Sequence, residues 1–134
     1  MTLKELSQLY YLNREIEMDR QRLERLKLKS QSPSSVRFDG MPRGTSVESR
    51  VERYAEEIAD LEAIIAAKHL QCIHERNRLE RYINDIDDSR LRMIFKLRFV
   101  NGLQWPQVAA HIGGNNTAKS VSKACYRYLD EDEN

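Results

Sequence analysis

The stretch DSRLRMIFKLRFVNGLQWPQVAAHIGGNNTAKSVSKACYRYL, residues 88–129, decides the fold predicted for this chain of 134 residues. It holds seven basic residues and one acidic residue, so its formal charge is +6, whereas the whole chain carries +1. The first 87 residues hold 15 basic and 16 acidic residues, and four acids follow in the tail. A local positive excess of this size is typical of a surface that binds nucleic acid.

Apolar periodicity and helix breakers divide residues 88–129 into three short helices. Asp88 is predicted to cap the first helix, and Gly102 to end it, because glycine tolerates the left-handed conformation that closes helices. Pro106 suits the first turn of the second helix, which Gly113 and Gly114 end. The third helix is predicted to begin at one of three capping residues, Asn115, Asn116 and Thr117.

The last two of these helices have the pattern of a helix-turn-helix. Apolar spacings of three and four predict their buried faces, formed by Trp105, Val108, Ala109 and Ile112, then by Val121, Cys125 and Tyr128. The opposite face of the last helix carries hydroxyl and cationic groups, which suits a helix laid in the major groove. The predicted DNA contacts are Thr117, Lys119, Ser120, Ser122, Lys123 and Arg127. Arg90, Arg92 and Gln107 are predicted to touch the flanking DNA backbone. A basic helix that is merely solvated, or that contacts phosphates only, is the alternative.

The run from Arg90 to Gly113 resembles the DNA-binding region 4 of bacterial sigma factors. Over nearly its full length the chain resembles short phage and prophage regulators, the ArpU-like late transcriptional regulators. The matching motifs are Leu97-Arg98-Phe99 with Gly102, the Trp105 helix, the closing Arg127-Tyr128-Leu129, and the runs SPSS (32–35) and MPRG (41–44). The resemblance implies a regulator that activates late genes, with double-stranded DNA and RNA polymerase as partners.

The turn departs from the common helix-turn-helix. That motif places an apolar residue six positions after the turn glycine, whereas Val121 stands eight positions after Gly113. The turn is therefore predicted to be longer, which shifts the choice of base-facing residues by one or two positions.

The first 87 residues are predicted to form a long antiparallel coiled-coil hairpin. Its first helix, residues ~3–29, carries an apolar stripe that Asp19 interrupts: Leu9, Leu12, Ile16, Leu23 and Leu26. Its second helix, residues ~47–86, carries a seven-residue repeat, which implies a left-handed coiled coil: Val51, Ile58, Ile65, Cys72, Leu79 and Ile86. Lys68 and Glu75 interrupt the other seam position, held elsewhere by Tyr54, Leu61 and Tyr82, and they either fix the register or mark a weak middle.

The two helices of the predicted hairpin differ in length, at about 40 Å and about 60 Å. The part of the longer helix that extends beyond the shorter one either carries the carboxyl-terminal module or pairs with a second copy of the chain. The second case would give a homodimer through the coiled coil. Residues 30–46 join the helices, and their prolines, glycines and serines exclude regular helix. This linker is either flexible or an ordered loop in which Arg37 and Arg43 reach a partner, and Ser46 is predicted to cap the next helix.

The fold class is thus predicted as all-α, with a coiled-coil hairpin (1–87) and a sigma-region-4-like module with an acidic, frayed tail (88–134). No catalytic constellation and no Gly-rich phosphate loop is visible, and no cofactor is expected. Cys72 and Cys125 lack zinc spacing and are expected to be reduced thiols in the bacterial cytoplasm. No apolar run of ~18 residues predicts a membrane span.

Two alternatives to a transcriptional regulator stay open. A DNA-recognition subunit of a phage packaging machine, similar to a small terminase, also joins a helix-turn-helix to oligomerising helices. A coiled-coil adaptor would bind RNA polymerase without touching DNA, although the +6 segment argues against it.

Overall fold

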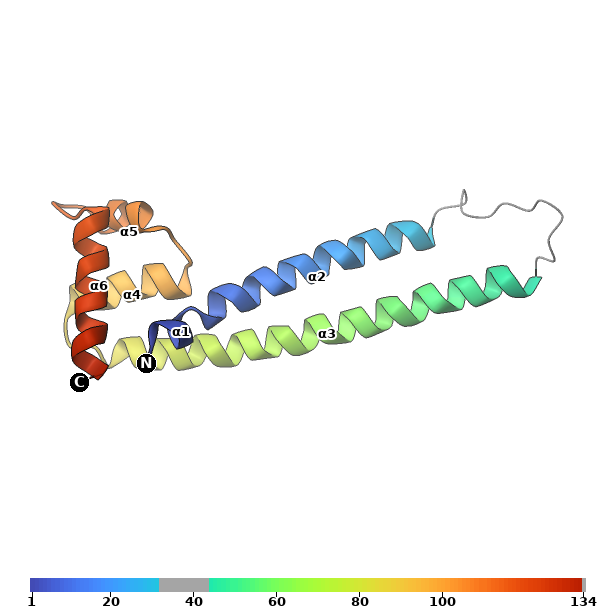
Figure 1. The fold of residues 1–134 in the computed structure, drawn as a ribbon, viewed down its shortest axis with the longest axis horizontal. Helices are drawn as coiled ribbons and strands as arrows, with labels where there is room; N and C mark the ends of the chain where they lie inside the picture. Colours follow the sequence, from blue (N-terminus) through green and yellow to red (C-terminus); the bar gives the residue numbers. More distant parts are fainter. Residues whose placement is uncertain (32–43, 134) are drawn as a thin grey trace. The chain divides into compact units, whose positions relative to one another are not determined.

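The computed structural model describes residues 1–31 and 44–133, and every regular element in these ranges is helical, which confirms the all-α class for this part of the chain. The elements are α1 (Leu3–Leu6), α2 (Gln8–Ser30), α3 (Gly44–Asn84), α4 (Ser89–Phe95), the π-helical turn η2 (Lys96–Val100), α5 (Trp105–Ile112) and α6 (Ala118–Glu133) (Figure 1). The predicted contacts of Arg37 and Arg43 lie outside the described residues.

Packing divides the chain into two compact units. Unit 1 comprises Met1–Asn13 and Gln71–Asn134, and unit 2 comprises Arg14–Leu70. Both units therefore contain parts of α2 and α3. The domain boundary predicted at residues 87–88 lies inside unit 1 and stays a prediction.

The first predicted helix is broken at Ser7, so the expectation of one continuous helix over residues ~3–29 was wrong. Thr2 and Glu5 form a capping box that starts α1. The Ser7 hydroxyl then donates to the carbonyl oxygen of Leu3 at 2.9 Å, within the last turn of α1. A serine that bonds back to the preceding turn bends helices, which accounts for the break before α2.

The start of α3 also differs from the prediction. The helix begins at Gly44, so residues 44–46 are helical rather than part of the linker, and Ser46 lies inside the helix instead of capping it. The helix continues without interruption for 41 residues. All positions of the seven-residue repeat from Val51 to Leu79 therefore lie on one continuous helix.

In unit 2 two of the polar residues that interrupt the apolar stripes, Asp19 of α2 and Lys68 of α3, form an ion pair. The Lys68 ammonium of α3 lies 2.6 Å from an Asp19 carboxylate oxygen and 3.2 Å from Glu15 of α2. The hydrogen bond with Asp19 raises the pKa of Lys68, as does the bond with Glu15, so the amine stays charged. Ile16 and Ile65 are buried in the same unit. The contacts favour the register role over a weak middle, because a slipped helix would separate these charges.

We expect Asp19→Leu to destabilise the protein more than the double change Asp19→Leu/Lys68→Leu, because the single change removes the closest partner of the Lys68 ammonium and puts an apolar side chain in its place. The thermal unfolding midpoint should fall in the single variant and recover in the double variant. The matched control is Arg76→Ala, which removes an ion pair whose side chains are 62% and 40% exposed and should change little. A double variant no more stable than the single one would contradict the pairing.

Unit 1 contains the last third of α3, residues 71–84. Its buried apolar side chains on the amino-terminal segment and on α3 are Leu6, Leu9, Leu12, Cys72, Leu79 and Ile83, and the following Ile86 is also buried. Glu75, the second interruption of the repeat, lies 3.8 Å from Arg78, whose guanidinium also pairs with Glu5 of α1 at 3.0 Å. Both polar interruptions are therefore used in ion pairs.

An aromatic cluster forms the core of the carboxyl-terminal helices. The Phe95 ring is fully buried, with ring centroids 5.5 Å from Phe99, 5.5 Å from Tyr128 and 6.3 Å from Tyr82. The cluster joins α4 and η2 to α6 and to the end of α3. Asp88 caps α4 as predicted, because its carboxylate accepts from the N–H groups of two residues in the first turn.

The last turns before Gly102 are π-helical rather than α-helical. The N–H of Asn101 donates to the carbonyl of Lys96, five residues back, at 3.0 Å. Gly102 then adopts a φ of 72° and ends the element, as its sequence position predicted. Single π turns of this kind occur at functional sites.

The four acidic residues 130–133 are helical in α6, so the prediction of a frayed tail was wrong for these residues. α6 extends to Glu133. Asp132 accepts a hydrogen bond from the Tyr82 hydroxyl at 3.0 Å and lies 3.7 Å from the Met1 ammonium. Burial, followed by the bond to Asp132, raises the pKa of Tyr82 well above its ordinary value.

Candidate nucleic-acid interface

The turn between α5 and α6 is fixed by two glycines and one asparagine. Gly113 and Gly114 have φ values of 77° and 64°, which a residue with a Cβ rarely adopts. The Asn116 amide donates to the carbonyl of Gly113 at 2.7 Å, and its oxygen accepts from Arg90 Nε at 2.9 Å. Arg90, predicted to contact the DNA backbone, therefore also positions the turn.

Thr117 caps α6, as one of the three predicted residues. Its hydroxyl accepts from the N–H of Ser120 at 3.1 Å, and the Ser120 hydroxyl accepts from the N–H of Thr117 at 2.9 Å. Two of the predicted DNA contacts thus build the start of the helix. Any contact that they make with DNA would come in addition to this cap.

The outward face of α6 is basic. Lys119, Lys123 and Arg127 recur every four residues and are exposed, and no side-chain hydrogen bond or ion pair joins their charged groups to the part of the chain that the structure describes. The Ser122 hydroxyl on the same face donates to the carbonyl of Lys119 at 3.1 Å. Val121 and Cys125 on the opposite face are fully buried. We name Lys119, Ser122, Lys123, Tyr126 and Arg127 the α6 face.

The side chains of Arg92 and Gln107 both form hydrogen bonds with backbone groups of the protein. Arg92 was predicted to face outward, but its Nη1 donates to the carbonyls of Ile86 at 2.6 Å and Asp87 at 2.9 Å, so it binds the chain just after α3 instead. The Gln107 side chain accepts from the N–H of Gln104 at 2.9 Å and so helps to cap α5. These hydrogen bonds could not be predicted from the charge or spacing of the two residues, because they depend on the positions of neighbouring backbone groups.

Arg98 and Trp105 stack in a row that ends at Tyr126 of the α6 face, an arrangement that was not predicted from the sequence. The guanidinium carbon of Arg98 lies 4.6 Å from the centre of the Trp105 ring, and that ring lies 6.0 Å from Tyr126. Arg98 also donates from Nη1 to the carbonyl of Leu103 at 2.9 Å. The sequence shows that Arg98 and Trp105 are seven residues apart. Their stacking could not be predicted from this spacing, because it depends on the conformation of the turn between η2 and α5.

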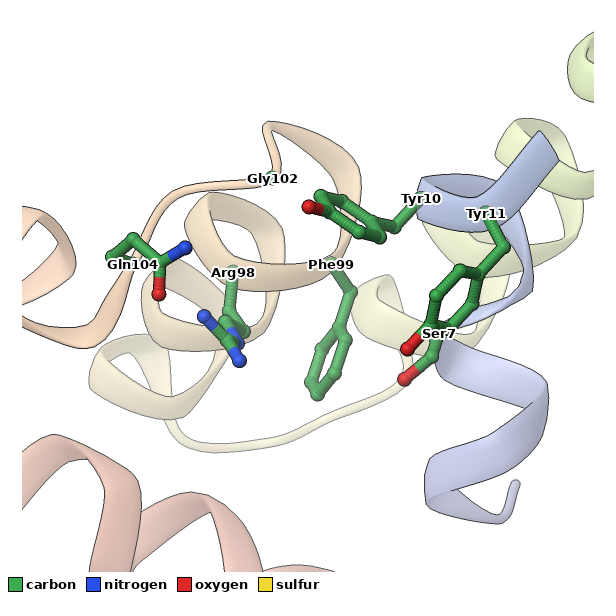
Figure 2. A pocket seen from close by; sticks show the side chains of 7 residues that line it. All are labelled: Ser7, Tyr10, Tyr11, Arg98, Phe99, Gly102 and Gln104. Carbon is green, nitrogen blue, oxygen red and sulfur yellow. The ribbon is translucent and has the colours of Figure 1, made fainter. Parts of the chain in front are cut away.

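A cavity of about 170 Å³ adjoins this row. The residues that line it come from two distant segments, Ser7, Tyr10 and Tyr11 from the first and Arg98, Phe99, Gly102 and Gln104 from the second. Figure 2 shows the two groups facing each other, with Tyr10, Tyr11 and Ser7 on one side and Arg98 and Gln104 on the other. Tyr10 and Tyr11 are 42% and 62% exposed.

Cys125 is placed to be chemically inert. Its side chain is fully buried, and burial raises the pKa of its thiol to about 12, an effect that the nearby Arg98 charge opposes. Because the thiolate is the reactive form, iodoacetamide should modify Cys125 at pH 8 at least about 100-fold more slowly in the folded protein than in urea. Peptide mass mapping follows the site, and equal rates in both states would contradict the burial.

The raised pKa of the Cys125 thiol also makes the stability of the folded protein depend on pH in the alkaline range. The pKa of the folded Cys125 thiol lies above its ordinary value of 9.0, so the folded protein keeps a proton that the unfolded chain loses. The stability contributed by this buried thiol is therefore fully present below pH 9 and is lost as the pH rises toward 12.

The part of the chain that the structure describes contains no group of three His, Cys, Asp or Glu side chains placed to hold a metal ion. Among the same residues, no helix is both long enough and apolar enough to cross a membrane. No protein-family model, curated protein or solved structure matches this chain.

Proposed function

We propose that this protein is a sequence-specific DNA-binding regulator of transcription from a phage or prophage. It acts in the cytoplasm of the bacterial host on late genes, with RNA polymerase as a further partner. The observation that carries the proposal is the α6 face, where Lys119, Lys123 and Arg127 are exposed and unpaired within the described chain. Unpaired cations on one helix face, together with a local charge of +6, favour a polyanionic ligand.

The local geometry supports a helix-turn-helix in which α6 enters the major groove. Val121, Cys125 and Leu129 anchor one side of α6 in the core and leave the basic side outward. A turn with two positive-φ glycines and the Asn116 contact precedes it. This turn matches the longer connection that the position of Val121 predicted. The side chains of α6 could then reach base edges, as recognition helices do.

The hairpin helices support the proposal of a dimeric protein. Within unit 2 the Lys68–Asp19 contact supports the pairing of α2 with α3 that we propose for an antiparallel coiled coil. Val51, Ile64 and Leu70 of α3 remain 60%, 46% and 56% exposed, which leaves apolar surface for a second copy. Two copies would place two α6 helices on one DNA site, so we propose an operator with two half-sites.

The proposal is tested by selection from a library of random-sequence DNA duplexes. After several rounds with the purified full chain, we expect enrichment of one motif that recurs as two half-sites. A library that stays unenriched would contradict sequence-specific binding. Light scattering of the complex then separates a dimeric regulator from the ring-shaped oligomer expected of a packaging subunit.

A further inference from the structure

We propose that the cavity between the amino-terminal segment and the η2–α5 segment binds one backbone phosphate of the DNA. This inference rests on the proposed DNA-binding function and adds a second contact site to it. None of the DNA contacts predicted from the sequence lines this cavity. The site would hold the sugar-phosphate backbone beside the groove that α6 enters, so it would position the protein on DNA without reading sequence.

The chemistry of the lining favours an oxyanion. Five of the seven lining residues carry polar side chains, namely Ser7, Tyr10, Tyr11, Arg98 and Gln104, and none is acidic. The hydroxyls of the two tyrosines, the Gln104 amide and the Arg98 guanidinium are groups of the types that contact phosphate oxygens in protein–DNA complexes. The Ser7 hydroxyl donates its proton to the Leu3 carbonyl and is therefore not among these donors. Phe99, which is 5% exposed, forms the remaining side-chain wall.

Arg98 is held in place and still has donors to offer. Its ring contact with Trp105 and its bond to the carbonyl of Leu103 fix the guanidinium beside the cavity. A guanidinium has five N–H donors, and within the described chain only Nη1 is used. Its geometry matches a phosphate with two parallel hydrogen bonds, so a preorganised Arg98 loses little freedom on binding.

A continuous row of side chains connects the cavity with the α6 face. Arg98 lies over Trp105, and the Trp105 ring lies 6.0 Å from Tyr126. Tyr126 stands three residues after Lys123, which puts both on the same side of α6. A helix in the major groove is flanked by the two phosphate backbones, so DNA placed against the α6 face would bring phosphates toward this row.

An acidic peptide is the competing occupant, and the lining fits it less well. A peptide is commonly held through its main chain at a sheet edge, or as a helix in an apolar groove. The seven lining residues provide neither a sheet edge nor an apolar helical groove, because they combine one cation with four neutral polar side chains, two of which are tyrosines, beside Phe99. The cavity is also small, at about 170 Å³, which suits one phosphate group better than a peptide segment.

The test uses Tyr10→Phe/Tyr11→Phe in the full chain, because both changes remove hydroxyl donors and keep the edge-to-face ring pair at 5.4 Å. The matched control is Tyr54→Phe in unit 2. With a duplex selected by the wild-type protein, the double variant should bind about tenfold more weakly, because two hydroxyl donors to the phosphate are lost. Ethylation interference should lose one backbone phosphate per bound copy, while protection of guanine N7 in the major groove is retained.

Three outcomes are decisive. Loss of affinity and of one phosphate contact in the double variant only would support the site. Equal affinity and an unchanged interference pattern, in a protein whose binding is still weakened by Lys123→Ala, would overturn the phosphate site but not the function, and would leave the cavity to an acidic peptide. A wild-type protein that binds no duplex would overturn both.

Discussion

Replacing Lys119, Lys123 and Arg127 together by alanine is expected to weaken binding to a selected duplex by at least about 100-fold. The three cations are exposed on the α6 face, and their charged groups have no partner in the described chain. Their removal is therefore expected to leave the stability of the fold unchanged. If each neutralises one phosphate, the slope of log K against log salt concentration should also become shallower by about 3. Fluorescence anisotropy at several salt concentrations measures both quantities.

The control for this triple variant has the same change in charge. Arg25, Lys27 and Lys29 of α2 are also exposed, and their replacement by alanine likewise removes one arginine and two lysines. If net charge alone attracts DNA, the two triple variants will lose affinity equally. A loss confined to the α6 variant would show that the position of the cations matters, whereas equal losses would contradict the assignment of the α6 face.

Phe95→Ala is expected to lower the free energy of unfolding by about 4 kcal/mol. The ring is fully buried and contacts three other aromatic rings, so its removal leaves a cavity at the centre of the carboxyl-terminal helices. Urea unfolding followed by circular dichroism measures the loss. The control is Met93→Ala in the same helix, where the side chain is 44% exposed and the expected change is within about 0.5 kcal/mol. Similar losses in both variants would show that the aromatic cluster is not the core.

The sequence predicted those features that depend on neighbours along the chain. Asp88 caps α4, Thr117 caps α6 and Gly102 ends η2, because capping and left-handed turns depend on local backbone geometry. The heptad positions of α3 were also identified correctly at Leu61, Ile65 and Leu79, which are buried. Val51 was expected in the same row but is 60% exposed.

Features that depend on distant contacts were not predictable. Asp19 and Lys68 each looked like a defect in an apolar stripe, and only their juxtaposition across 49 residues explains both. Arg92 was predicted to face outward, but it binds carbonyl groups whose positions depend on the turn before α4. Arg98 was noted as part of the Leu97-Arg98-Phe99 motif, and its bond to the Leu103 carbonyl depends on the turn after η2. The cavity combines Tyr10 with Arg98, and no periodicity connects those two segments.

The most direct test of the account is a titration of the wild-type protein with its selected duplex and with a scrambled duplex of equal length, repeated over a salt series. We predict tighter binding of the selected duplex at every salt concentration, and weaker binding of both as salt increases, because cations of the α6 face displace counterions from phosphates. No binding of either duplex at low salt would contradict a DNA-binding function and would assign the α6 face to a protein partner.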